Sequence, residues 1–329
     1  MKFMFKGIDF FPHDTRWKII ERRYIFIGLS WALAIMSAVL LMTRGLNYGV
    51  DFKGGSLIEV QSKVGKLDIA TLRGKLDNLG VGEVQVQGVG QGNEALIRVA
   101  QRPATAELSE EKAQAAANDK VKQALGNEIE VRRVEVVGPT VSNELKRTGV
   151  IAVICSMLGI MLYVWFRFEW QFGVAAILAL SHDVFITVGM FSLLWYEFDL
   201  SVVAAILTLA GYSINDTVVV FDRIRENLRR YKRMPLIDLL NLSINETLSR
   251  TVLTSVTTAL AVLALYIFGT AVIHGFSFAM LFGIVIGTYS SIFVAAPLLL
   301  LFGVKRDVNE EKASAKGDTR ARGASVALK

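Results

Sequence analysis

Two aspartates stand inside long apolar runs of this 329-residue chain, where a carboxylate is costly and is therefore a candidate for function. Asp183 lies within the run 173–195, beside His182, and Asp216 lies within the run 202–221. A carboxyl group at membrane depth can carry protons, or it can anchor neighbouring helices through hydrogen bonds. Both roles stay open for Asp183, and proton transport is the favoured role for Asp216.

Polar side chains surround Asp216 at helical spacing. Ser213 and Asn215 precede it, and Arg223 follows two helical turns later on the same face. The next apolar run opens with Arg250, which is either an interfacial anchor or a counter-ion to the carboxylate. Hydroxyl groups then recur along one side of that run, where they either line a hydrated path or bond their own helix backbone. These hydroxyl residues are Thr251, Thr254, Ser255, Thr257 and Thr258.

The chain offers few other groups for chemistry. Its single cysteine, Cys155, excludes an internal disulfide, and no Cys/His spacing matches a zinc site. The segment 44–147 lacks clustered His or Cys and paired catalytic carboxylates, so we expect no enzymatic activity and no metal. The net charge of +6, from 36 basic and 30 acidic side chains, indicates basic cytoplasmic loops in a membrane chain rather than nucleic-acid binding.

Carboxylates at this depth need membrane-spanning helices to hold them. Apolar residues make up 53% of the chain, and six stretches approach the roughly 20 apolar residues that cross a bilayer. The first is expected to be a retained anchor rather than a signal peptide, because its apolar run is long. Gly283 and Gly287 form a GxxxG motif in the sixth span, which favours close helix packing. The predicted spans are 25–43, 148–166, 173–195, 202–221, 251–270 and 278–302.

The distribution of Lys and Arg predicts the orientation of these spans. The segment 1–24 holds six of them, the loop 222–250 holds seven and the tail 303–329 holds seven. The positive-inside rule therefore places both termini in the cytoplasm and the segment 44–147 outside it. The composition of the tail, rich in charged and small residues, predicts disorder.

The exported segment 44–147 alternates between helical and strand periodicity. The expected order is β-α-β-β-α-β, which is the ferredoxin-like arrangement of two helices on one face of a four-stranded sheet. The predicted fold is thus an α-helical polytopic membrane protein with an α+β ferredoxin-like periplasmic domain between its first two spans. The predicted strands are 56–61, 83–89, 95–100 and 129–137, and the predicted helices are 67–79 and 106–125.

Five short motifs follow one another along the chain. The first contains Gly49, Asp51, Phe52, Gly54 and Gly55, and the others lie at 181–183, 211–227, 245–251 and 287–292. Together they resemble the signatures of the SecD/SecF family of protein-export membrane proteins, and its SecF side in particular, within the resistance-nodulation-division superfamily. The resemblance extends over about residues 16–302.

This resemblance implies a subunit that acts with SecD beside the SecYEG channel in the bacterial inner membrane. Such a subunit uses the proton-motive force to help draw preproteins out of the cytoplasm, and it needs no cofactor other than protons as the coupling ion. The resemblance also implies that Asp216 is the proton-carrying carboxylate and Arg250 its cationic neighbour. YajC, YidC and membrane lipid are further implied partners.

Two other functions stay open on the residues alone. A six-span half with carboxylates at mid-membrane also fits a small-molecule or lipid exporter of the same superfamily. An intramembrane aspartyl protease would use Asp183 and Asp216 as a catalytic pair. The GxGD motif expected around the second aspartate of such a protease is replaced here by Ser213-Ile-Asn-Asp.

Overall fold

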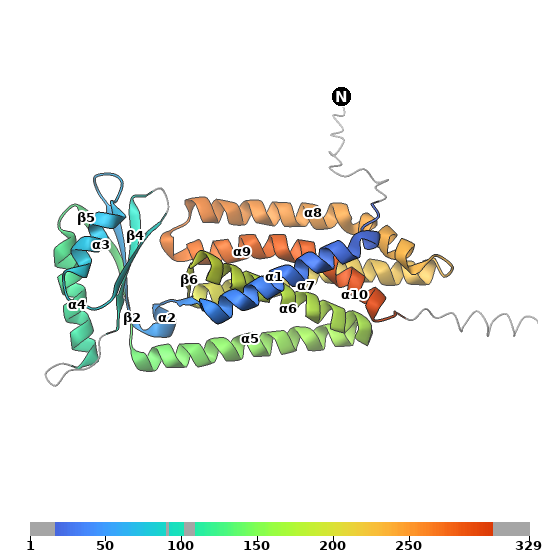
Figure 1. Cartoon of the computed structure of the whole chain (residues 1–329), viewed down its shortest axis with the longest axis horizontal. Coiled ribbons are helices and arrows are strands. Elements are labelled where there is room, and N and C mark those ends of the chain that lie inside the picture. The colour runs from blue at the N-terminus through green and yellow to red at the C-terminus, as the bar shows by residue number, and fades with distance from the viewer. Residues whose placement is uncertain (1–16, 90–91, 102–108, 305–329) are drawn as a thin grey trace, which may run out of the picture.

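The protein is elongated, with a small α/β domain at one end and a bundle of long helices along the rest (Figure 1). It is seen here in a computed structural model that describes residues 17–89, 92–101 and 109–304. Six helical segments in this part of the chain are long and apolar enough to cross a membrane, as the sequence predicts. The chain is therefore a multi-pass membrane protein.

The six spans consist of the long helices and the short ones that extend them. They are α1 (Arg23–Thr43), α5 (Pro139–Arg167), α6 (Trp170–Leu194), α7 (Leu200–Arg230), α8 (Leu236–Phe268) and α9 (Ala271–Ser290). A 3-10 turn at Ile20–Arg22 precedes α1, and α9 continues through a π-helical turn at Ser291–Ala295 into α10 (Ala296–Leu301). The π-helical turn comes just before Pro297, which cannot donate a backbone hydrogen bond, so the wider turn accommodates this interruption.

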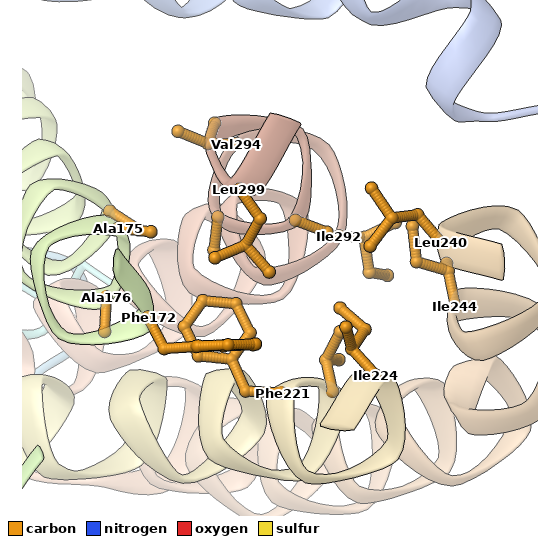
Figure 2. Close-up of a cluster of buried hydrophobic side chains, with 14 of the residues drawn as sticks. Phe172, Ala175, Ala176, Phe221, Ile224, Leu240, Ile244, Ile292, Val294 and Leu299 are labelled. Carbon is orange, nitrogen blue, oxygen red and sulfur yellow. The ribbon is translucent and has the colours of Figure 1, made fainter. Parts of the chain in front are cut away.

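The bundle has a central and a peripheral set of helices. About half of the apolar stretch of α6, α7 and α9 is buried, whereas α1, α5 and α8 expose most of theirs. The main core lies at the bundle end opposite the small domain, where Phe172 of α6 meets Phe221 of α7 and Leu240 of α8 belongs to the same cluster (Figure 2). The outward apolar faces of the peripheral helices are the surfaces that lipid would cover.

Gly283 and Gly287 allow α9 to approach α7 closely. A Cβ atom at Gly283 would collide with the Leu209 side chain, and one at Gly287 would lie 3.1 Å from the Ser213 Cβ. The two glycines of the GxxxG motif thus face α7, a helix of the same chain.

The segment 222–250, expected to be a loop, is mostly helical. Helix α7 continues to Arg230 and α8 begins at Leu236, so only 231–235 connect them. The helices continue because apolar side chains recur on their inward faces beyond the predicted spans and join the main core, as Ile224 and Leu239 do. Helix α5 likewise starts ahead of its predicted span, with Pro139 at its first position.

The small domain has the ferredoxin-like topology that the sequence predicts. Its four strands form an antiparallel sheet in the order β3-β4-β2-β5, with α3 and α4 packed on it. The start of the predicted helix 106–125 and most of the predicted tail 303–329 lie outside the described residues. The elements are β2 (Gly55–Ser62), α3 (Ile69–Asp77), β3 (Val84–Val89), β4 (Glu94–Ala100), α4 (Glu110–Leu125) and β5 (Ile129–Val137).

Candidate functional site

Asp183 is fully buried at the centre of the bundle and ties three helices together. Its Oδ2 atom accepts hydrogen bonds from the hydroxyls of Ser213 on α7, at 2.6 Å, and Ser290 on α9, at 2.7 Å. Its Oδ1 atom lies 3.0 Å from Nδ1 of His182, the preceding residue. Short bonds from several donors satisfy a buried carboxylate and fix its position.

Asp216 is also buried, at 3% exposure, but it is held much more loosely. Among the described residues its one hydrogen-bond donor is Ser255 of α8, whose Oγ atom lies 3.4 Å from Oδ2. The same hydroxyl lies 2.8 Å from the Thr251 carbonyl oxygen and 2.6 Å from the Thr288 hydroxyl. Because a serine hydroxyl has a single proton, the longest of these contacts, the one to Asp216, is the weakest.

The two clusters exist because α9 packs closely on α7. Gly287 leaves room beside Ser213, so the side chains that follow it on α9 reach the central polar layer. Ser290 meets Asp183, and Ser291 lies 3.0 Å from the hydroxyl of Thr217, the residue after Asp216. The close approach at Gly287 thus brings one α9 hydroxyl to the Asp183 carboxylate and another to the neighbour of Asp216.

The predicted hydroxyl path along α8 divides into two groups. Three of the threonines donate to carbonyls of their own helix, which is the second of the two alternatives, bonding to the helix backbone in place of a hydrated path. They are Thr254, Thr257 and Thr258. Of the five hydroxyl residues in the predicted path, Ser255 is the one that contacts Asp216. Thr288 and Ser290 of α9 were not predicted as site residues, because nothing in a single sequence indicates which face of α9 meets α7.

Neither Arg250 nor Arg223 forms a hydrogen bond or ion pair with Asp216 among the described residues. Arg250 is exposed and within electrostatic reach of the carboxylate, but it forms no ion pair among the described residues. Arg223, predicted to share a polar face with Asp216, instead bonds Glu246 of α8 and Glu226 of its own helix, each at 2.7 Å. Arg223 therefore joins α7 to α8 and is not in contact with the carboxylate.

Asn215 points away from the bundle. It is exposed, and no hydrogen bond is recorded for its side chain among the described residues. It continues a row of exposed small or polar residues along α7, which we call the open face. The open face consists of Ala204, Thr208, Gly211 and Asn215.

The glycine-containing motif after α1 forms the joint between the small domain and the bundle. Its residues 50–53 form the short helix α2 (Val50–Lys53), in which Phe52 is buried and stacks on Phe198. Gly54 and Gly55 have φ angles of +76° and +117°, which favour glycine, and a Cβ would collide with the Gln101 side chain at Gly54 and with the Val99 carbonyl at Gly55. Gly49 is equally confined, because a Cβ there would lie 2.8 Å from the Glu197 carboxylate.

This joint is bonded to the first turn of α7, the helix that carries Asp216. Oδ2 of Asp51 accepts a hydrogen bond of 2.9 Å from the Leu200 backbone nitrogen, and the Asp199 side chain caps the same helix by accepting from Val202. Strands β1 (Asn47–Tyr48) and β6 (Glu197–Phe198) pair in parallel beside it.

Arg98 of β4 fastens the small domain to this joint. Its nearly buried guanidinium pairs with Glu197 and donates to the Tyr48 carbonyl at 3.1 Å. It also lies 3.3 Å from side-chain oxygens of Asn47 and Gln85. A buried arginine with this many acceptors fixes the two parts relative to each other, because losing one partner would leave a buried charge unsatisfied.

Asp199 makes the stability of the folded protein depend on pH. Burial is the main cause that raises the pKa of its carboxyl from 3.8 to about 6, with the nearby charges of Glu197 and Asp51 adding to the rise. The folded protein therefore binds a proton that the unfolded chain releases, so this contribution to stability is lost as the pH rises through about 6. Asp199→Asn keeps the capping oxygen, and we expect it to raise the unfolding temperature more at pH 8 than at pH 5.

Asp68, the N-cap of α3, provides a control, because its pKa is shifted in the opposite direction from that of Asp199. Hydrogen bonds from Thr71 lower the pKa of its exposed carboxyl. Asp68→Asn is therefore expected to lower the unfolding temperature near neutral pH and to lose this effect in acid. A difference between Asp199→Asn and the unmodified chain that is the same at pH 5 and pH 8 would contradict the assignment to Asp199.

Comparison with known proteins places the chain among protein-export components. Residues 117–305 match the family described as "Protein export membrane protein SecD/SecF, C-terminal", and residues 39–64 match the "SecD/SecF GG Motif". The protein translocase subunit SecF of Cereibacter sphaeroides is 44% identical over 90% of this chain and 92% of its own length. SecDF of Brucella abortus is 43% identical over 89% of this chain and 38% of its own length.

The crystal structure of SecDF from Thermus thermophilus, described as a translocon-associated membrane protein, superimposes with a TM-score of 0.78 at 38% identity. The match covers 89% of this chain and 39% of that one, so this chain spans about two fifths of the length of the solved structure. The matched relatives are translocase subunits and not enzymes, so neither the exporter nor the aspartyl protease is favoured. The two carboxyl groups of an aspartyl protease share a proton through a hydrogen bond. Among the described residues no such bond joins Asp183 to Asp216.

Proposed function

The chain belongs to the SecD/SecF family of protein-export membrane proteins, and from this premise we propose that it is the SecF-type half of a proton-driven export complex. With SecD it uses the proton-motive force to promote passage of preproteins through SecYEG in the bacterial inner membrane. Protons are the coupling ion, and YajC and YidC are further partners. Moving one proton through a total force of roughly 150–200 mV releases about 3.5–4.5 kcal/mol, which is the energy available to each cycle.

The observation that carries this proposal is the contrast between the two buried carboxylates. Asp183 has short bonds to two hydroxyls and a contact with a histidine, which suits a permanent tie between helices. Asp216 has one long contact with a shared hydroxyl and an arginine within electrostatic reach but unpaired. A carboxyl group that gains and loses a proton must be free to change its partners, so Asp216 is the proton carrier and Asp183 the anchor.

The open face of α7 supports a partner subunit that packs on α7 and forms the second half of the proton site. In lipid, the exposed amide of Asn215 would have no hydrogen-bond partner, which is unfavourable inside a bilayer. Gly211 has no neighbouring atom within 4 Å of the position of a Cβ, so another helix can approach there closely. Coupling-ion sites of transporters commonly lie where two such halves meet. SecD is the proposed partner, in keeping with relatives in which this chain matches 38% of a longer SecDF polypeptide.

The joint couples the proton site to the exported domain. Helix α7 carries Asp216, and its first turn is bonded to Asp51 of the motif that leads into the small domain. Arg98 then holds the sheet of that domain against Glu197, two residues before the Asp199 cap. A tilt or shift of α7 on protonation of Asp216 would therefore move the small domain, which is how we propose that proton movement acts on a preprotein.

We propose that residues 44–147 are periplasmic and that both termini are cytoplasmic. In a Cys155→Ala background, a membrane-impermeant thiol reagent added to intact cells should label Lys112→Cys on α4 and spare Lys232→Cys between α7 and α8. Both lysines are exposed, so access to the side chain does not bias the comparison. Permeabilised cells should label both positions, and the reverse pattern in intact cells would overturn the orientation.

Export into membrane vesicles tests the function itself. Vesicles would contain SecYEG and SecD, with or without this chain, and would receive a preprotein whose ATP-driven translocation is stopped part of the way. We expect an imposed proton gradient to complete the export only when the chain is present, and an uncoupler to abolish the effect. Equal export without the chain would overturn the proposed function.

A further inference from the structure

An apolar groove opens on the side of the bundle next to the joint. Its volume is about 640 Å³, and it lies between α5, α6 and α7 under the short helix α2. The surface of the groove is mainly aliphatic, with Val150 and Ile154 from α5, Val188 from α6 and Ile206 from α7. Val150 and Ile154 are more than half exposed, so the groove faces the apolar surroundings of the bundle.

Two lysines stand at the rim of this groove. Lys53 ends α2, and Lys146 lies on α5 just before its apolar run. Both are exposed, and neither forms a hydrogen bond or ion pair recorded among the described residues. Basic side chains at the end of a membrane helix lie at the level of lipid headgroups, where each attracts anionic lipid.

We propose that this groove binds an anionic phospholipid from the leaflet on the side of the small domain. One acyl chain occupies the groove, and the phosphate lies between the ammonium groups of Lys53 and Lys146. The apolar lining matches a hydrocarbon chain, and the two cations match the charge of the headgroup. An acyl chain in the bilayer is already out of water, so the apolar groove accommodates it by shape, and the two lysines supply the preference for an anionic headgroup.

A peptide fits the groove less well. The walls are helices whose backbone groups bond within their own segments, so an extended peptide would find no partners for its N–H and C=O groups. A partner helix is expected elsewhere, on the open face of α7, where exposed polar residues could hydrogen-bond to it. A hydrocarbon chain requires neither hydrogen bonds nor a polar match.

Native mass spectrometry of the purified full-length chain tests the proposal with two probes that share acyl chains, phosphatidylglycerol and phosphatidylcholine. We expect one phosphatidylglycerol to bind more tightly than phosphatidylcholine. Lys53→Gln and Lys146→Gln should each weaken phosphatidylglycerol binding about fivefold and leave phosphatidylcholine unaffected. Arg147→Gln removes an exposed charge beside Lys146 that does not line the groove, so it is the matched control and should have a smaller effect.

Filling the groove tests the position of the acyl chain. Val150→Trp should displace both lipids, whereas Leu158→Trp, two turns further along the exposed side of α5 and outside the groove, should displace neither. If Val150→Trp prevents folding, Ile154→Phe serves the same purpose with a smaller change.

Three results would overturn the proposal. If the two lipids bind equally and their binding does not depend on the lysines, Lys53 and Lys146 do not form a headgroup site. Lipid binding that survives both groove-filling variants would locate the lipid elsewhere. Displacement of phosphatidylglycerol by an apolar, signal-sequence-like peptide that no longer binds Val150→Trp would assign the groove to a peptide.

Discussion

Asp216→Asn is expected to abolish proton-driven export while the chain still assembles with SecD at normal levels. Asparagine preserves the size of the side chain and its capacity to accept a hydrogen bond from Ser255, but it cannot carry a proton. Asp216→Glu keeps the proton and displaces it by one methylene, so partial activity is expected, because a shift of about 1 Å can be costly at a working site. The measurement is the rate of gradient-driven preprotein export from vesicles that contain both halves and the channel.

Asp222→Asn is the matched control for this experiment. Asp222 lies on the same helix, but it is exposed and paired with Arg167 on the surface of the bundle, 2.9 Å away. Its replacement should leave export unchanged, since surface ion pairs contribute little. Arg250→Lys should impair export, because an ammonium group does not reproduce the planar, multi-donor guanidinium. Export at the unmodified rate in Asp216→Asn would remove Asp216 as carrier and make Asp183 the next candidate.

Gly211→Leu is expected to prevent stable assembly with SecD. The position of a Cβ at Gly211 is free of neighbours in this chain, so leucine should be tolerated within the bundle and should obstruct only an approaching helix. Co-purification of tagged SecD with the variant, measured against the unmodified chain, should fall at least tenfold. Gradient-driven export should fall with it.

Gly159→Leu on α5 provides the comparison. Gly159 of α5 is also exposed and has no neighbour within 4 Å of a Cβ, and leucine there should leave assembly intact. Gly287→Leu is expected to destabilise the chain itself, because Gly287 faces Ser213. Normal co-purification of SecD with Gly211→Leu would show that the open face is not the contact surface.

The elements with strong periodicity could be predicted from the sequence. Long apolar runs locate the six spans, and alternation locates the strands within a residue or two, as for β5 at Ile129–Val137. The ends of the helices were less predictable, because amphipathic turns beyond the membrane, such as the one that buries Ile224, lack the continuous apolar composition of a span.

The site was predictable only in part. A carboxylate in an apolar run is visible in one sequence, so Asp183 and Asp216 could be selected. Their different surroundings depend on which helices meet, and the bonds from Ser213 and Ser290 to Asp183 arise from tertiary packing of α6, α7 and α9. The same applies to the open face, since helical periodicity alone does not tell whether Asn215 or Ser213 points into the bundle.

Proton uptake by sealed vesicles measures whether Asp216 carries protons. Vesicles containing this chain together with SecD would carry a pH-sensitive dye inside, and a potential negative on the inside would be imposed. We expect rapid acidification with the unmodified chain, and none beyond the rate of protein-free vesicles with Asp216→Asn or with this chain alone. Full proton uptake by vesicles that contain Asp216→Asn with SecD would contradict the claim that Asp216 carries the proton.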